Sequence, residues 1–372
     1  MKTKREFLFN PRPLSEKSKK NLEIFEVMRK KGIISRLDIS KITGINTVSV
    51  SNYMKNYISQ NLVLERGFDV STGGRKPELV ELNLKGNYAI GVDVNDSGMR
   101  IALTDLAINA IEKNSVGISG KADTPGIIAA VEDVIKRSRV EPDKIKAVGI
   151  GISNPDAVSV EDIRKKSGIE VFTSAREICA ASAENRLNPA SQGDDLLYMH
   201  SDLGYGVIIK NETYIDSESE YGKSDSPEYT EYLSGWGRAL GMVESAKGEI
   251  EKGVGTRIVD LVKGNIANIT QKTVIAAAKD KDEIATDIVE HVGMNLGLKT
   301  AYLINLFGPK VVVIGGGVEE AGELILAPVK RVVRKLSLNK YSNVVIALGA
   351  IGEDAVSLGA ASLAIREILL KA

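Results

Sequence analysis

Apolar positions recur with a helical period in the first 60 residues and gather into short continuous runs after residue 88. Residues 17–31 show the pattern of an amphipathic helix, and residues 35–60 contain two shorter helical patterns. Two strand patterns follow at 62–66 and 78–82. This order of three helices and a hairpin predicts a winged helix-turn-helix domain.

The two shorter helices are predicted to meet at a tight turn. Ser35 is a typical N-cap residue, and Asp38 three positions later completes a capping-box pattern. Ile39 and Ile42 give the first of these helices an apolar edge, and Gly44 is a typical C-terminal stop. The spacing therefore predicts a helix that begins after Ser35 and ends at Gly44.

The next helix, which begins after the N-cap residue Asn46, has one apolar and one polar face. The apolar positions fall at i, i+3, i+4, i+7 and i+8, which are Val50, Tyr53, Met54, Tyr57 and Ile58. The opposite face carries small polar side chains and one lysine but no acid, and such a face suits the major groove of DNA. An ordinary helical hairpin with a solvated face is the alternative.

The predicted DNA contacts continue from this helix to the tip of the hairpin. Residues 73–76 are two glycines followed by Arg75 and Lys76, and Arg75 is placed to enter a narrow, A·T-rich minor groove. Asn61, between helix and hairpin, tolerates the left-handed conformation. We expect phosphate or minor-groove contacts from Ser51, Lys55, Arg75 and Lys76, base-edge contacts from Thr47, Val48, Ser49 and Asn52, and a further contact from Arg36.

From residue 88 the pattern changes to that of an α/β protein. Buried-strand runs occur at 89–94, 145–153 and 310–318, and a long helix is predicted at 282–307. The theme of strand, hairpin, helix and strand occurs twice, which implies two lobes around a cleft. The predicted domains are a loose arm (1–16), the winged helix-turn-helix (17–82), a linker (83–87) and a two-lobed body (88–372), with lobe 1 at about 88–195 plus 355–372 and lobe 2 at about 196–354.

Charge is unevenly divided along the 372 residues, although basic and acidic side chains number 49 each. Residues 1–86 hold 17 lysines and arginines against 9 aspartates and glutamates, so this part carries +8 and the remainder −8. A basic head on an acidic body fits a head that meets phosphates. The single cysteine, Cys179, excludes a disulfide framework within the chain. The first 20 residues are polar and no apolar run reaches the ~18 residues of a membrane span, so we expect a cytoplasmic protein.

Four motifs make the chain resemble the ROK family of repressors, open reading frames and kinases. They are SVS at 49–51, GGRKP at 73–77, VIGGGV at 313–318 and GEDAVSLGAA at 352–361. The resemblance covers nearly the whole chain and implies two actin-like lobes of the ribonuclease H-like ATPase fold. Repressor members of the family add an N-terminal winged helix and typically respond to sugars, whereas members without that helix are typically hexose kinases. The resemblance therefore implies a sugar-responsive transcriptional regulator, and we expect a repressor.

The phosphate-binding and catalytic motifs of the family are altered in this chain. Where the family has Asp-x-Gly-Gly-Thr, this chain has DVNDS at 93–97, so side chains replace both glycines that let backbone amides approach a phosphate. The family's catalytic aspartate aligns with Arg176, which cannot be deprotonated near neutral pH. The resemblance therefore implies a pseudokinase, and ATP binding is not expected. The alternative is an active ROK-type sugar kinase with a regulatory DNA-binding head.

The family's zinc site is also absent from the sequence. Lys223 takes the place of the histidine ligand and the cysteine cluster is missing, so no metal is expected. Glu220 and Glu231 match two carboxylates that bind sugar hydroxyls in the family and are candidate ligand-binding residues, with surface acids as the alternative. Arg176 is a third candidate, because Arg176 and Lys223 would make the cleft more basic and suit a phosphorylated or acidic effector. The loop at 154–169 is short for the family.

Three kinds of partner are expected. The first is a double-stranded DNA operator, and the second is a sugar or sugar-phosphate effector. The third is a further copy of the chain, as a homodimer or a dimer of dimers, because winged helices usually bind two half-sites. Residues 315–317 are three glycines that either line a phosphate or form a tight turn after a strand.

Overall fold

The computed structural model describes residues 14–68, 77–95, 98–117, 123–153, 158–191, 195–201, 204–209, 212–216 and 241–371. The chain forms two compact units, of which the first holds residues 1–179 and 356–372 and the second holds residues 180–355. We call residues 16–82 of the first unit the head.

Three helices form most of the head: α1 (Glu16–Lys31), α2 (Arg36–Thr43) and α3 (Thr47–Ser59). The predicted caps are confirmed, since Ser35 Oγ accepts a hydrogen bond from the Asp38 amide at 3.0 Å and Asn46 Oδ1 accepts one from the Ser49 amide at 2.8 Å. Gly44 ends α2 in the left-handed conformation, with φ at 69°. Short-range signals of this kind fix the ends of a helix regardless of distant contacts, and this is why the sequence located them.

A three-stranded antiparallel sheet with strand order β1-β3-β2 completes the head. Its strands are β1 (Ile34–Ser35), β2 (Val63–Phe68) and β3 (Glu78–Leu82). The two-residue strand β1 was not predicted, because so short a segment shows no periodicity. Asn61 adopts the left-handed conformation as expected, with φ at 58°. The predicted tip of the hairpin lies outside the described residues.

The apolar faces of α1 and α3 meet in the core of the head. The fully or nearly fully buried side chains from these helices are Ile24, Phe25, Met28, Val50, Met54 and Tyr57. Tyr53 and Ile58, also predicted for the apolar face, are half-buried. On α2 the prediction of an apolar edge holds for Ile39, which is buried, but is wrong for Ile42, which is 53% exposed, because this short helix buries only one residue.

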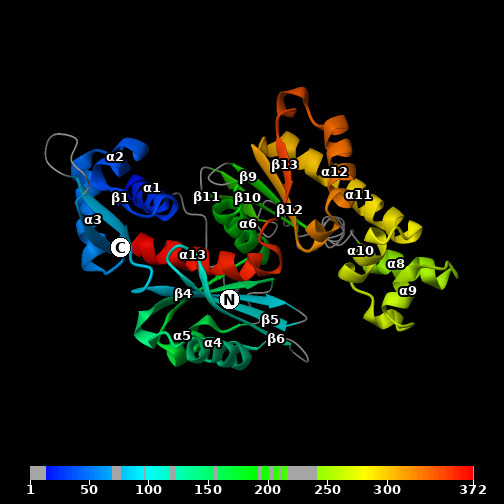
Figure 1. Cartoon of the computed structure of the whole chain (residues 1–372), viewed down its shortest axis with the longest axis horizontal. Coiled ribbons are helices and arrows are strands. Elements are labelled where there is room, and N and C mark those ends of the chain that lie inside the picture. The colour runs from blue at the N-terminus through cyan, green and yellow to red at the C-terminus, as the bar shows by residue number, and fades with distance from the viewer. Residues whose placement is uncertain are drawn as a thin grey trace, which may run out of the picture. The chain divides into compact units, whose positions relative to one another are not determined.

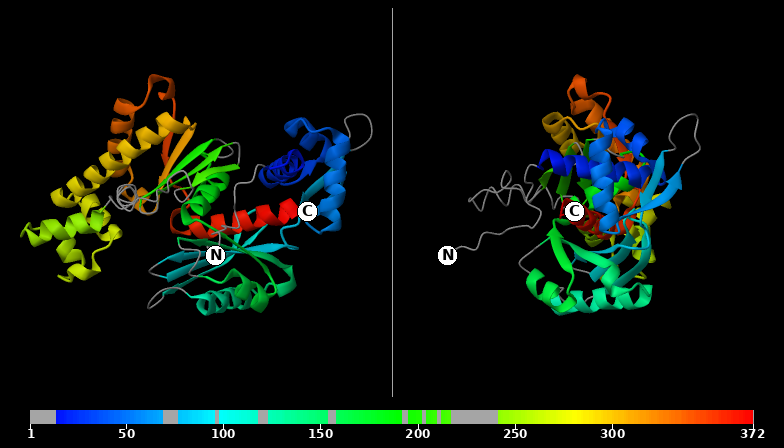
Figure 2. Two further views of the ribbon diagram at one scale, coloured as in Figure 1. Left: turned by 180° about the vertical axis from the view of Figure 1, so that it is seen from behind. Right: turned by 90° about the vertical axis from the view of Figure 1, so that its left-hand side faces the viewer.

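The first unit also contains a five-stranded mixed sheet with strand order β6-β5-β4-β7-β8. Its strands are β4 (Tyr88–Asn95), β5 (Gly98–Asp105), β6 (Ala110–Gly117), β7 (Ile145–Ile152) and β8 (Glu170–Ser174). Helices α4 (Thr124–Ser138) and α5 (Val160–Ser167) lie on one face, and α13 (Ala355–Lys371) crosses the other (Figures 1 and 2). Strand β6 was not predicted, and the segment expected as a loop at 154–169 contains α5.

Two glycines let α13 lie directly on the sheet backbone. A Cβ atom at Gly91 of β4 would lie 1.8 Å from the Ser357 carbonyl oxygen, and one at Gly149 of β7 would lie 2.0 Å from that of Ala360. No side chain fits at these positions, so α13 and the central strands pack at the closest distance that two backbones allow.

The second unit has its own five-stranded sheet, with strand order β11-β10-β9-β12-β13. The strands are β9 (Leu196–His200), β10 (Gly204–Ile209), β11 (Glu212–Asp216), β12 (Val311–Gly315) and β13 (Val345–Leu348). The helices are α8 (Met242–Glu251), α9 (Arg257–Leu261), α10 (Gln271–Lys279), α11 (Glu283–Phe307) and α12 (Glu323–Leu336). Helix α11 confirms the predicted long helix and packs on α12 through Gly293 and Gly297, which carry no side chain to hold the two helices apart.

The boundary between the units falls inside a helix. Helix α6 (Arg176–Leu187) begins in the first unit, and the division lies between Cys179 and Ala180 rather than near residue 195, where the sequence placed the end of lobe 1. The head belongs to the same compact unit as the first sheet. Within the described ranges, none of the helices is both long enough and apolar enough to cross a membrane.

Candidate functional site

Helix α3 presents a polar face to solvent. Thr47, Val48, Asn52 and Lys55 are exposed, and Val48 is the most exposed of the large apolar residues described, at 70%. Ser49 and Ser51 are half-buried. Of the residues predicted to contact base edges, Thr47, Val48 and Asn52 are therefore accessible to solvent, and Ser49 is partly so. The first turn of α3 contains no acidic residue, so its positive helix end is not compensated by a carboxylate of that turn.

Arg36 does not belong to that surface. Its guanidinium lies 2.6 Å from a Glu65 carboxylate oxygen and 3.0 Å from one of Glu78, and its side chain is 17% exposed. Two carboxylates of the hairpin strands therefore balance its charge, and Arg36 ties α2 to the hairpin. The DNA contact expected of Arg36 stays a prediction, and it would require the guanidinium to leave or share these two carboxylates.

Several candidates lie outside the described residues: Arg75 and Lys76 at the hairpin tip, and Glu220, Lys223 and Glu231 at the predicted effector site. The structure gives no information on these five residues. Among the residues that it does describe, no three histidine, cysteine, aspartate or glutamate side chains lie close enough together to hold a metal ion.

In the first unit, Arg176 forms a buried ion pair with Asp93. Arg176 Nε donates to Asp93 Oδ1 at 2.6 Å, and Nη2 donates to Oδ2 at 3.1 Å. The Asp93 side chain is 3% exposed and that of Arg176 is 14% exposed. This two-pronged geometry is the strongest common form of a side-chain ion pair. Asp93 of β4 and Arg176, the first residue of α6, thus neutralise each other.

In the second unit, the carboxylate of Glu319 accepts a hydrogen bond from the three-glycine turn that follows β12. The Gly317 amide donates to Glu319 Oε2 at 2.7 Å, and the Gly316 carbonyl accepts from Ser201 Oγ at 2.7 Å. Gly316 and Gly317 have φ values of 90° and 95°, which require glycine. The Glu319 carboxylate therefore occupies an amide that could otherwise donate to a phosphate oxygen.

Burial raises the pKa of Glu319, and the neighbouring Glu184 and Glu320 raise it further. Glu184 is itself buried on α6, where it accepts hydrogen bonds from the Ala350 and Ile351 amides, and burial raises its pKa also. The turn therefore lies beside excess negative charge, which opposes the binding of a polyphosphate. No pattern in the sequence points to this carboxylate, because the partners of Glu319 depend on how the turn folds.

Replacing Glu319 by glutamine is expected to stabilise the folded chain at pH 7 by up to about 1 kcal/mol. Below the unperturbed pKa of 4.5, the carboxyl group is protonated in both the folded and the unfolded chain. As the pH rises above that value, the unfolded chain loses its proton first, so the folded state loses stability. Glutamine keeps an oxygen for the Gly317 amide and does not titrate.

Thermal unfolding of wild type and Glu319→Gln between pH 4 and 8 measures this effect. The gain at pH 7 should vanish near pH 4. Glu320→Gln is the matched control, since Glu320 is more exposed and lies 3.5 Å from the Lys272 ammonium group. A Glu319→Gln variant that is less stable than wild type at pH 7 would contradict the view that burial and the neighbouring carboxylates make the charged form of Glu319 unfavourable.

Known proteins resemble this chain in sequence over most of its length. The ROK family model matches residues 241–367. The xylose repressor of Caldicellulosiruptor bescii is 25% identical over 373 residues, which cover 91% of this chain and 93% of that protein. The DNA-binding transcriptional dual regulator NagC of Escherichia coli is 23% identical over 350 residues, which cover 86% of this chain and 85% of NagC.

Solved structures share the fold. A ROK family transcriptional regulator that is a homologue of the E. coli MLC protein matches with a TM-score of 0.71 and 20% identity, over 95% of this chain and 96% of that chain. A ROK family glucokinase from Streptomyces griseus, solved with glucose and AMPPNP, matches with a TM-score of 0.62 and 22% identity, over 75% of this chain and 99% of that one. The α/β architecture expected from the sequence is thereby confirmed, and residues 241–367 match the ROK family model.

Proposed function

We propose that this protein is a sequence-specific DNA-binding transcriptional regulator, a repressor that responds to a sugar or sugar derivative. One observation supports the proposal: α3 buries Val50, Met54 and Tyr57 and exposes Val48, Asn52 and Lys55 on its opposite face, as a recognition helix would. Repression is supported by the relative that is named a xylose repressor, and DNA binding by the relative that is named a DNA-binding transcriptional dual regulator.

We further propose that the body neither transfers phosphate nor needs ATP or zinc. Phosphoryl transfer requires a positioned base and amides that hold the phosphates. The ion pair of Asp93 with Arg176 and the hydrogen bond of Glu319 with Gly317 support a body in which both requirements are unmet. The similarity to a glucokinase fold is the reason to test this directly.

Selection of duplexes from a random DNA pool by the purified full chain tests the regulator proposal. We expect enrichment of one sequence, and weaker binding to it in the presence of the effector. Pentoses, N-acetylated hexosamines and their phosphates are the probes to add, and each is first screened by its effect on the thermal unfolding midpoint. The absence of any enriched sequence at moderate salt would contradict the proposal.

An ATP-depletion assay with the same sugars tests the loss of kinase activity. We expect no consumption of ATP above that of the buffer. Turnover with any sugar would instead support an active sugar kinase that carries a regulatory head, and it would show that the Asp93–Arg176 pair opens during catalysis.

A further inference from the structure

A buried side-chain amide links the head to the last helix of the chain. Asn21, on α1, is 4% exposed, and its Nδ2 donates to the Leu369 carbonyl oxygen of α13 at 2.6 Å. The Tyr57 hydroxyl of α3 donates to the Asn21 side-chain oxygen and reaches the Asn21 carbonyl at 2.9 Å. A single residue therefore contacts both the DNA-facing helix and α13.

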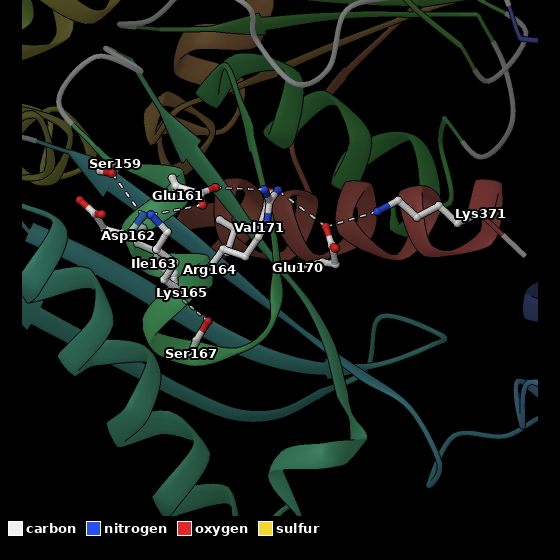
Figure 3. A network of polar contacts seen from close by, with 10 residues as sticks. All are labelled: Ser159, Glu161, Asp162, Ile163, Arg164, Lys165, Ser167, Glu170, Val171 and Lys371. Atoms are coloured by element: carbon white, nitrogen blue, oxygen red, sulfur yellow. Dashed lines mark hydrogen bonds and ion pairs between the residues drawn. The ribbon is translucent and has the colours of Figure 1, made fainter.

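The contact satisfies a backbone group that α13 leaves open. The last four carbonyls of a helix have no partner within it, and Leu369 lies in the final turn of α13 and is completely buried. The Lys371 ammonium group, two residues further on, lies 3.3 Å from a carboxylate oxygen of Glu170 on β8, and the same oxygen lies 3.7 Å from the guanidinium of Arg164 on α5 (Figure 3). The end of α13 therefore contacts the head through Leu369 and strand β8 of the five-stranded sheet through Lys371.

Helix α13 is itself fixed to the sheet. The close backbone contacts at Gly91 and Gly149 leave no room for it to slide. Its Gly359 packs equally closely on α6, where an added Cβ would lie 1.6 Å from the Cys179 carbonyl oxygen. Because such interfaces resist continuous deformation, α13 offers the head a rigid attachment point.

The predicted linker, residues 83–87, is fixed by hydrogen bonds to Asn61. Asn83 Nδ2 donates to the Asn61 carbonyl at 3.1 Å and to its side-chain oxygen at 2.9 Å, and Asn87 Nδ2 donates to the Asn61 carbonyl at 2.6 Å. Asn83 and Asn87 are 7% and 2% exposed. Asn61 lies two residues beyond the end of α3, so the segment at 83–87 is hydrogen-bonded to the chain directly after the helix that carries Tyr57.

We propose that Asn21 and Tyr57 are positioning residues, which hold α3 in one orientation against α13 and thereby set the affinity for the operator. The consequence for DNA rests on the proposed function, whereas the positioning itself does not. A winged helix that rotated freely on its body would lose orientational order before binding, and binding would have to restore that order at a cost in affinity.

Distances between spin labels test the positioning. Labels at Ile42→Cys on α2 and Lys136→Cys on α4 occupy exposed sites. The natural Cys179 does not react, since it is buried and burial raises the pKa of its thiol. We expect one narrow distribution of label distances when Asn21 and Tyr57 are unchanged, and a broad distribution when the labelled chain also carries Asn21→Leu or Tyr57→Phe.

Tyr53→Phe is the matched control, because the Tyr53 hydroxyl donates at 3.0 Å to the Lys17 carbonyl, a contact that does not involve Asn21, the residue bonded to α13. It should keep the narrow distribution. Tyr57→Phe retains the buried ring, so it tests the same contact even if Asn21→Leu does not fold. Circular dichroism shows whether each variant is folded. A distribution that stays narrow in Tyr57→Phe and in folded Asn21→Leu would overturn the positioning role.

Binding to the selected duplex tests the consequence for DNA. We expect Asn21→Leu and Tyr57→Phe to bind about fivefold to tenfold more weakly, the usual size of one net hydrogen bond, and Tyr53→Phe to bind as wild type does. Unchanged affinity alongside a broadened distribution would overturn the proposal. If no duplex is selected at all, the regulator function fails, while the label distances still decide whether the head is held.

Discussion

Replacing Arg176 by alanine is expected to destabilise the first unit by about 3–5 kcal/mol, the usual loss when one partner of a buried ion pair is removed. Asp93 would then remain at 3% exposure with its charge uncompensated. The loss should appear as a lower denaturation midpoint and as faster hydrogen exchange of the amides in β4 and β7, which adjoin the pair.

The double variant Asp93→Ala with Arg176→Ala separates this explanation from simple loss of packing. It removes both charges, so it should be more stable than Arg176→Ala alone, and the interaction energy from the cycle should be clearly different from zero. Arg164→Ala is the matched control, since Arg164 is 38% exposed and its carboxylate partners Glu161 and Glu170 are more exposed still. It should cost less than 1 kcal/mol. Equal losses in the two single arginine variants would contradict the buried-pair account.

The sequence predicted those elements whose signals are short-range. The caps at Ser35 and Asn46 and the apolar face of α3 depend on residues three or four positions apart, and the structure confirms all three features. Strand β6 and helix α5 were missed, because the former is mostly exposed and the latter buries only Ile163. Neither segment shows a strong apolar period.

The partners of charged residues were beyond the reach of sequence reasoning. Arg36 is basic and adjoins the predicted DNA-reading helices, yet the fold pairs it with Glu65 and Glu78 of the hairpin strands. The resemblance aligns Arg176 with a catalytic aspartate, which remains a prediction, and its partner Asp93 lies 83 positions away in the chain. Periodicity assigns side chains to faces, whereas the choice between a ligand and an internal partner is made by tertiary contacts.

Replacing Asn52 by alanine is expected to weaken binding to the selected operator by about 1–3 kcal/mol, which is roughly 5-fold to 150-fold in affinity. Asn52 is exposed at the centre of the polar face of α3, one helical turn beyond Val48. An asparagine amide can donate to and accept from the edge of adenine at once, so its removal should also relax the preference at one base pair and leave binding to unrelated DNA unchanged.

Fluorescence anisotropy with the operator, with single-base variants of it and with a scrambled duplex measures these effects. Asn295→Ala is the matched control, because Asn295 is an exposed asparagine inside helix α11 of the second unit and should leave affinity unaltered. A uniform loss on all duplexes would make Asn52 a backbone contact instead. Equal affinity of wild type and Asn52→Ala for the operator would contradict the proposed register of α3 on DNA, because the buried Val50, Met54 and Tyr57 leave no second face of α3 free to replace it.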